Sequence, residues 1–133
     1  MYRKCYGEQD YEEVYDYRNI EVTIDEQDIF NVTMNESLAV ALLTNLLKNA
    51  FVHNIDGGHI RITVTKNSIT FRNSGVKNPL DKEHIFERFY QGTKKEGSTG
   101  LGLAIADSIC RLQHLSIRYY FEQKEHCFEI SRQ

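Results

Sequence analysis

The sequence predicts an α+β domain in which helices cover one face of a mixed, mainly antiparallel sheet. The segment 36–53 repeats its apolar residues with the period of a helix, and the segment 100–112 is an apolar, helix-forming run. Short alternating runs surround these helices, and two of them, 60–64 and 69–72, are joined by a polar turn as in a hairpin. Helices interleaved with hairpins favour a layer of helices on a sheet.

The first half of the chain divides into a polar start, two strands and a long helix. Residues 1–17 are acidic and tyrosine-rich and indicate the cut edge of a domain, and 1–133 as a whole is expected to be a single domain. The alternation in 20–24 predicts a strand, and 29–34 predicts a second. Asn35 is expected to cap the following helix.

The helix 36–53 carries an unusual polar row beside its apolar stripe. Asn45, Asn49 and His53 recur every four residues, so they share one face. Solvated surface amides are one interpretation. The other is a ligand site, because an amide oxygen is a suitable hard ligand for Mg²⁺.

The second half begins with a turn at 56–58 and the predicted hairpin, which ends at Asn73-Ser74-Gly75. This end is either a simple turn or an amide aimed at a ligand. Pro79 predicts the start of a short helix that carries Ile85, Phe86 and Phe89. The polar, glycine-bounded segment 91–99, with Lys94 and Lys95, is expected to be a mobile lid. Strands are predicted at 115–122 and 126–131.

Three glycines, Gly97, Gly100 and Gly102, lie just before and at the start of the last predicted helix. A glycine-rich loop before a helix offers unpaired N–H groups and the positive end of the helix dipole, which suits a phosphate. A flexible turn that caps a buried helix is the alternative. The loop matches neither the common P-loop nor the dinucleotide-binding fingerprint.

The composition excludes several functions. Apolar residues make up 41% of the chain and charged residues 26%, as in an ordinary globular protein. The net charge of −3 gives no basic surface for nucleic acid. No apolar run is long enough to cross a membrane, so no direct membrane contact is expected. The three cysteines lack CxxC spacing and fit a reducing cytoplasm, and Cys110 is expected in the core.

Four segments carry a resemblance to a known family: NLLKNA (45–50), NSG (73–75), IFERFY (85–90) and GSTGLGL (97–103). In their order and spacing they resemble the N, G1, F and G2 boxes of the ATP-binding catalytic domain of sensor histidine kinases. The resemblance covers most of the chain from Asn19 onward. It implies the Bergerat α/β sandwich, which gyrase and chaperone ATPases share, and it implies ATP and Mg²⁺ as cofactors.

The resemblance also implies roles for individual residues. Asn49 matches the Mg²⁺-coordinating asparagine, Asn45 lies near the phosphates, and His53 lies beside the adenine. Asn73 matches the residue that reads the adenine amino group, and Gly75 is the G1 glycine. Arg88, Lys94 and Lys95 are candidate contacts to the γ-phosphate or to another domain. The backbone around the triphosphate is expected from the G2 segment, in Gly97, Thr99, Gly100, Leu101 and Gly102.

Three positions depart from the family pattern. Asn73 stands where the family usually has Asp, Val52 where a Lys is common, and Gln91 where an Arg often ends the F box. Each change is expected to weaken ATP binding. Because an amide can flip to donate to the guanine carbonyl, weaker discrimination against GTP is expected as well.

The resemblance implies transfer of the γ-phosphoryl to a histidine on a separate dimerisation domain, with a response regulator downstream. Asn45 stands where the ATPases of this fold carry a Glu base, so slow hydrolysis is expected. His114 and His126 are expected at the surface near strand edges, and no phosphoacceptor helix is found. The expected location is cytoplasmic, with an inner-membrane anchor of the full protein left open. A degenerate nucleotide-binding or interaction module without kinase turnover is the alternative.

Overall fold

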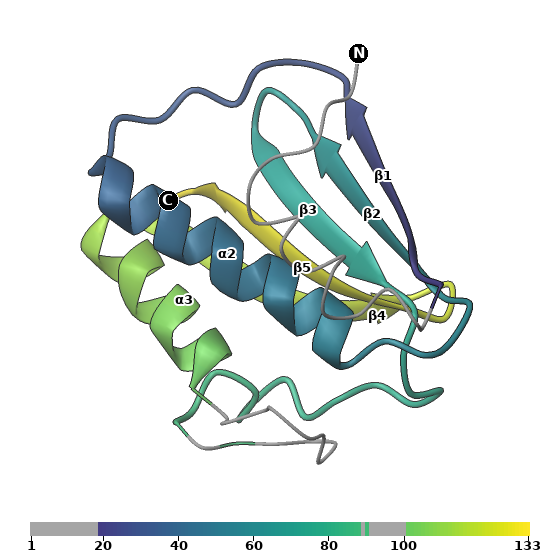
Figure 1. Ribbon diagram of the computed structural model, residues 1–133. Coiled ribbons are helices and arrows are strands. Elements are labelled where there is room, and N and C mark those ends of the chain that lie inside the picture. Colours follow the sequence, from purple (N-terminus) through teal and green to yellow (C-terminus); the bar gives the residue numbers. More distant parts are fainter. Residues whose placement is uncertain (1–18, 89, 91–100) are drawn as a thin grey trace.

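The computed structural model describes residues 19–88, 90 and 101–133. Within these residues, five strands form one sheet in the order β1-β2-β3-β5-β4, and two helices lie against one of its faces (Figure 1). The strands are β1 (Glu21–Glu26), β2 (His59–Val64), β3 (Ser68–Asn73), β4 (Leu115–Glu122) and β5 (Glu125–Arg132). The helices are α2 (Glu36–Val52) and α3 (Gly102–Leu112).

The sheet has the mixed, mainly antiparallel pairing that the sequence predicts. β1 pairs with β2 in parallel, and α2 supplies the crossover that a parallel pair requires. The remaining pairs are antiparallel. The predicted β2–β3 hairpin is confirmed, with Val64 opposite Ile69 and Ile60 opposite Asn73.

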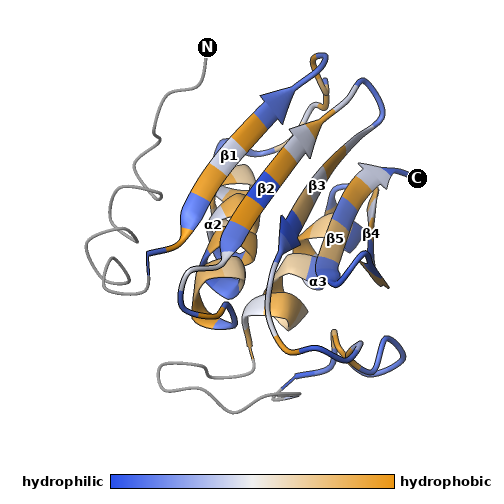
Figure 2. Cartoon of the chain, turned by 90° about the vertical axis from the view of Figure 1, so that its right-hand side faces the viewer, coloured by the Kyte–Doolittle hydropathy of each residue, from blue (hydrophilic) through white to orange (hydrophobic). Residues whose placement is uncertain are grey.

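The core lies between the sheet and the two helices. Strand residues alternate between the helix side and the opposite face, which Figure 2 shows as alternating hydrophobic and hydrophilic bands. Ile60, Phe71 and Phe128 are buried among the core residues. Cys110 is 1% exposed, and burial raises the pKa of its thiol to about 11, so its placement in the core is confirmed.

The strand expected at 29–34 is wrong. These residues form a loop that leads from the end of β1 to the start of α2 (Figure 1). The Ile29 side chain is 64% exposed, so it does not lie on the inner face of the sheet as a strand residue would. Side-chain contacts from Arg132, rather than backbone pairing, hold this loop. The Arg132 guanidinium donates to the Asn31 carbonyl at 2.7 Å and stacks on the Phe30 ring.

The short helix expected after Pro79 is also wrong, because residues 82–88 form successive turns. Backbone bonds there span three residues, from His84 N to Asp81 O and from Glu87 N to His84 O. The Asp81 carboxylate also accepts from the His84 ring at 2.6 Å, and such local side-chain bonds compete with a regular helix. The apolar residues of this segment still reach the core, since Ile85 is fully buried.

Candidate functional site

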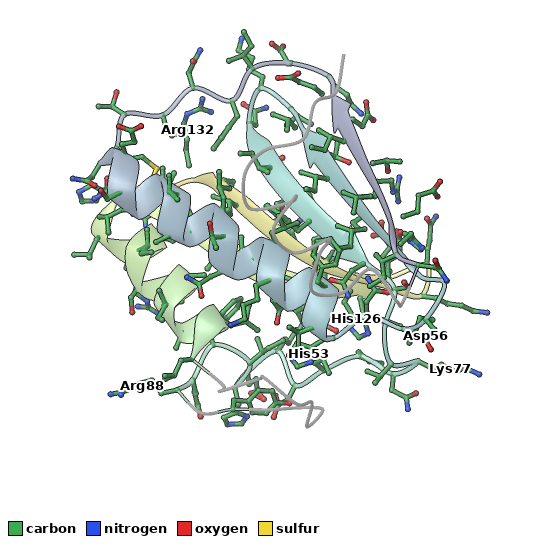
Figure 3. All side chains as sticks on the ribbon, viewed as in Figure 1. His53, Asp56, Lys77, Arg88, His126 and Arg132 are labelled. Atoms are coloured by element: carbon green, nitrogen blue, oxygen red, sulfur yellow. The ribbon has the colours of Figure 1, made fainter. Side chains whose placement is uncertain are left out.

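A pocket opens at the end of the domain where α2 finishes and β3 and β5 meet the following segments. It is lined by both polar and apolar side chains: Asn49, His53, Asn73, Val76, Leu80, Ile85, Tyr90, Leu103, His126 and Phe128. Figure 3 shows His53 and His126 close to each other at this end. The structure therefore brings together three of the residues that the sequence analysis singled out, Asn49, His53 and Asn73.

Asn73 places an unpartnered hydrogen-bond acceptor in the wall of this pocket. It is the last residue of β3 and is 2% exposed. Its Nδ2 donates to the Ser74 carbonyl at 2.7 Å, which orients the amide. Its Oδ1 is buried and has no hydrogen-bond partner. An orphaned buried acceptor is costly, so this oxygen is suited to a ligand that brings a donor.

The polar row on α2 is divided between two environments. Asn49 and His53 are half-buried and line the pocket. Asn45 lies one turn earlier, and its Nδ2 donates to the Ala41 carbonyl at 2.8 Å. Its Oδ1 faces the start of α3, because a Cβ added to Gly102 would lie 3.3 Å from it. Asn45 therefore belongs to the α2–α3 contact beside the pocket.

The packing of the chain around position 75 requires a glycine. A Cβ at this position would lie 2.9 Å from the His53 carbonyl oxygen and 3.1 Å from Cδ2 of His126. The chain after β3 thus passes closely between the end of α2 and β5. The close approach at this glycine is therefore to two residues of the pocket wall, His53 and His126.

A polar network that the sequence analysis missed connects α2 to β3. Asn54 is fully buried, and its Nδ2 donates to the carbonyls of Ala50 and His59 at 3.0 Å each. Its Oδ1 accepts from Ser74 Oγ at 2.6 Å. The network fixes the end of α2, which carries Asn49 and His53, against the end of β3, which carries Asn73. Its only signal in the sequence is an asparagine directly after the helix.

The surface position expected for His126 is wrong. The residue is 3% exposed and forms part of the pocket wall. Its Nδ1 lies 2.7 Å from the Tyr119 hydroxyl, and its Nε2 lies 2.7 Å from the Val76 carbonyl. Burial lowers the pKa of the imidazole. The alternation of β5 contained the signal, because His126 shares a face with Phe128 and Ile130.

Other predicted residues lie elsewhere. Arg88 is exposed, and Figure 3 shows it directed away from His53 and His126. Leu101 and Gly102 are at the start of α3. Val52 is buried, 4% exposed. The lid expected at 91–99 lies outside the described residues, as do these named positions: Phe89, Gln91, Lys94, Lys95, Gly97, Thr99 and Gly100.

The described residues contain neither a cluster of metal-binding His, Cys, Asp or Glu side chains nor a membrane-spanning helix. No group of three or more His, Cys, Asp or Glu side chains that could hold a metal ion was found in 19–88, 90 and 101–133. Within the same part of the chain, no helix has the length and apolarity needed to span a membrane.

The comparison of sequences identifies the family to which this fold belongs. Residues 34–131 match the histidine kinase-, DNA gyrase B-, and HSP90-like ATPases, and the chain belongs to this family. Sensor histidine kinase RppB of Synechocystis is 43% identical over 84 residues, which cover 56% of this chain and 18% of that protein. Heme sensor protein HssS of Staphylococcus aureus is 38% identical over 94 residues, which cover 67% of this chain and 21% of that protein. The chain thus spans about a fifth of the length of these curated relatives.

Solved structures agree with this assignment. The catalytic domain of histidine kinase ThkA is 25% identical with a TM-score of 0.78, covering 93% of this chain and 85% of that one. The mycobacterial sensor histidine kinase MprB shares the fold at 19% identity and a TM-score of 0.74, covering 95% and 93%. The relatives and the fold place this chain among the ATP-binding catalytic domains of sensor histidine kinases.

Proposed function

We propose that the domain binds Mg·ATP in the pocket described above and presents the γ-phosphoryl group to a histidine on a separate dimerisation domain. Membership of the family supports ATP as the ligand. The observation that carries the proposal for this chain is the orphaned Oδ1 of Asn73, because it lies in the wall that Asn49 and His53 also line.

The pocket fits the chemistry of adenine. The base carries an exocyclic amino group, which is a donor, and Asn73 offers a buried acceptor whose orientation is held by the bond from Nδ2 to Ser74. The flat purine has two apolar faces, and Val76, Leu80 and Phe128 supply an apolar lining. A mostly apolar pocket with a few placed polar groups is the usual form of a cofactor site.

Residues of α2 and of the start of α3 would hold the metal and the phosphates. Asn49 offers an amide oxygen, and Mg²⁺ takes such oxygens together with phosphate oxygens and water. Gly102 opens α3, where unpaired backbone N–H groups suit a phosphate. Arg88, Lys94 and Lys95 are proposed as contacts to the γ-phosphate or to the acceptor domain.

ATP supplies the activated phosphoryl group, and the residues of this chain bind and orient it. Asn45 offers no base for water, since an amide takes no proton at neutral pH, and its Nδ2 is engaged by the Ala41 carbonyl. Without a base to activate water, hydrolysis of ATP is expected to be slow, which leaves the γ-phosphoryl group available for transfer to a histidine. With labelled ATP, we expect the chain alone to acquire no stable phosphate, and a stably labelled chain would contradict the acceptor in trans.

The relatives support the partners that we propose. The ThkA structure in complex with the response regulator TrrA shows that pairing for ThkA. Full-length ShkA has been solved with AMPPNP, an ATP analogue. For the present chain we propose a dimerisation domain of the same kinase as acceptor, a response regulator downstream, and a cytoplasmic location.

Calorimetric titration with ATP, in the presence and absence of Mg²⁺, tests the proposal. Asn49→Ala is expected to remove most of the metal-dependent part of the affinity, because it deletes the proposed ligand oxygen. Asn67→Ala is the control, since Asn67 is exposed in the β2–β3 turn away from the pocket lining. Equal Mg²⁺ dependence in the parent and in Asn49→Ala would refute the metal site.

A further inference from the structure

A chain of hydrogen bonds runs from β4 and β5 to the segment that follows β3. The His126 ring lies between the Tyr119 hydroxyl and the Val76 carbonyl, each at 2.7 Å. The Tyr119 hydroxyl also accepts from the Leu80 N–H at 2.9 Å. Two side chains of the sheet thus hold two backbone groups of residues 75–80. We call these four groups the His126 relay.

The direction of each bond follows from the groups involved. The Val76 carbonyl only accepts, so Nε2 of His126 carries the hydrogen. In the neutral ring Nδ1 is then the acceptor, and the Tyr119 hydroxyl donates to it. The Tyr119 oxygen remains free to accept from Leu80. Every donor and acceptor in the relay is therefore satisfied when His126 is neutral.

The anchored segment forms one wall of the pocket. Val76 and Leu80 both line it, and Gly75 passes against the His126 ring. In the described part of the chain, residues 75–80 form no backbone–backbone hydrogen bond. Their position therefore depends on the relay and on packing, and Asn73 directly precedes them.

We infer that His126, directly at Val76 and through Tyr119 at Leu80, is a positioning residue that holds the 75–80 wall where the nucleotide needs it. This inference rests on the proposed function. Without the relay, the 75–80 wall would lose both of its backbone anchors. The free energy of nucleotide binding would then be reduced by the cost of ordering the wall. The affinity for Mg·ATP should then depend on residues that need not touch the nucleotide.

The relay also makes the wall sensitive to protonation. A doubly protonated His126 ring would turn Nδ1 into a donor facing a hydroxyl that already accepts from Leu80. The titratable groups on the same side are His53 at the end of α2, Tyr90 and Tyr119. The described pocket lining contains no carboxylate that could compensate a charge on the ring. ATP affinity is therefore expected to fall on acidification.

Three conservative variants separate the parts of the relay. Tyr119→Phe removes the hydroxyl and keeps the ring. His126→Gln keeps a donor near Nε2 and loses the acceptor at Nδ1, whereas His126→Asn does the reverse. Tyr120→Phe is the matched control, because it removes a hydroxyl one residue away whose partner is Arg72.

Calorimetric titration of the 133-residue chain with Mg·ATP at pH 8.0 and about pH 5.5 gives the decisive readout. Each relay variant is expected to weaken binding roughly five- to tenfold at the higher pH, the size of one lost hydrogen bond. The parent should lose more affinity on acidification than His126→Gln does, which isolates His126 from His53. Tyr120→Phe should match the parent in both respects.

Hydrogen exchange without nucleotide provides an independent check. The Leu80 amide should exchange faster in Tyr119→Phe than in Tyr120→Phe, because only the former loses its acceptor. A parent that binds no Mg·ATP would overturn the proposed function. A parent that binds, with relay variants that bind equally well and with the same pH dependence, would overturn only the role of the relay.

Discussion

At the scale of single residues, the candidate site combines residues that the sequence predicts with residues whose place becomes visible only in the fold. Asn49, His53 and Asn73 were predictable because their spacing and the turn after β3 are local features. The hydrogen-bond partners of His126 and Asn54 were not predictable, since they lie far away in the sequence: Val76 is 50 positions from His126, and Ser74 is 20 positions from Asn54. Burial of a polar residue depends on which distant groups satisfy it.

The Asn73 amide is expected to select ATP over GTP. Flipping it to donate to a guanine carbonyl would place Oδ1 against the Ser74 carbonyl, where Nδ2 now donates at 2.7 Å. The structure thus opposes the flip that the sequence alone allowed. We expect ATP to bind about tenfold more tightly than GTP, the value of roughly one hydrogen bond. Parallel titrations with both nucleotides measure this, and equal affinities would show that Asn73 does not read the base.

The adjacent glycines Gly57 and Gly58 should respond differently to alanine. A Cβ at Gly58 would lie 2.1 Å from Asn54 Oδ1 and 2.3 Å from Ser74 Oγ, so it would break the Asn54 network. Gly57 has a φ of 73° with open space around it, so its cost is conformational only. We expect a loss of about 1 kcal/mol for Gly57→Ala and at least about 3 kcal/mol for Gly58→Ala in urea unfolding. Equal losses would remove the structural role of the network.

At the scale of elements, sequence periodicity identified the two helices and five strands of the described residues to within two residues at their ends. It failed at 29–34 and after Pro79. In the first case apolar residues alternate, but Ile29 and Val32 face solvent because the chain must travel from β1 to α2. In the second, Asp81 uses its side chain to bond the next turn. The local sequence pattern predicts neither of these two features.

The β4–β5 turn is a place where the sequence is not optimal for its conformation. Gln123 and Lys124 both have positive φ, 53° and 64°, as a type I′ hairpin turn requires, but neither is a residue type that favours it. Replacing the pair by Asn-Gly should stabilise the domain by about 1 kcal/mol or more, because the left-handed conformation costs Asn and Gly less. Urea unfolding measures the gain. A destabilised double variant would indicate that the two side chains contribute contacts worth more than the strain.

At the scale of the whole molecule, burial of His126 links folding to pH. Burial lowers the pKa of this imidazole in the folded state, against a smaller opposing effect of the hydrogen bond to Val76. The unfolded chain therefore binds the proton more readily than the folded chain does. The stability contributed by neutral His126 is present above the unfolded pKa of about 6.5 and is lost as pH falls through the lower folded value.

The expected result is a free energy of unfolding that declines below about pH 6.5, and His126→Gln should flatten this decline. Urea unfolding between pH 8 and about pH 5, with Tyr120→Phe as the control, measures it. An identical decline in His126→Gln would assign the effect to other groups.

The sheet order has a consequence for how copies of the domain meet one another. Among the residues that the structure describes, β1 is an edge strand whose ladder partner is β2, and an open edge is a template for pairing with another chain. Glu21, Asp25 and Glu26 are exposed on this strand. Two copies that approached through β1 would bring these carboxylates together, and their repulsion opposes edge-to-edge association. Because salt screens exposed charges, this protection weakens as ionic strength rises.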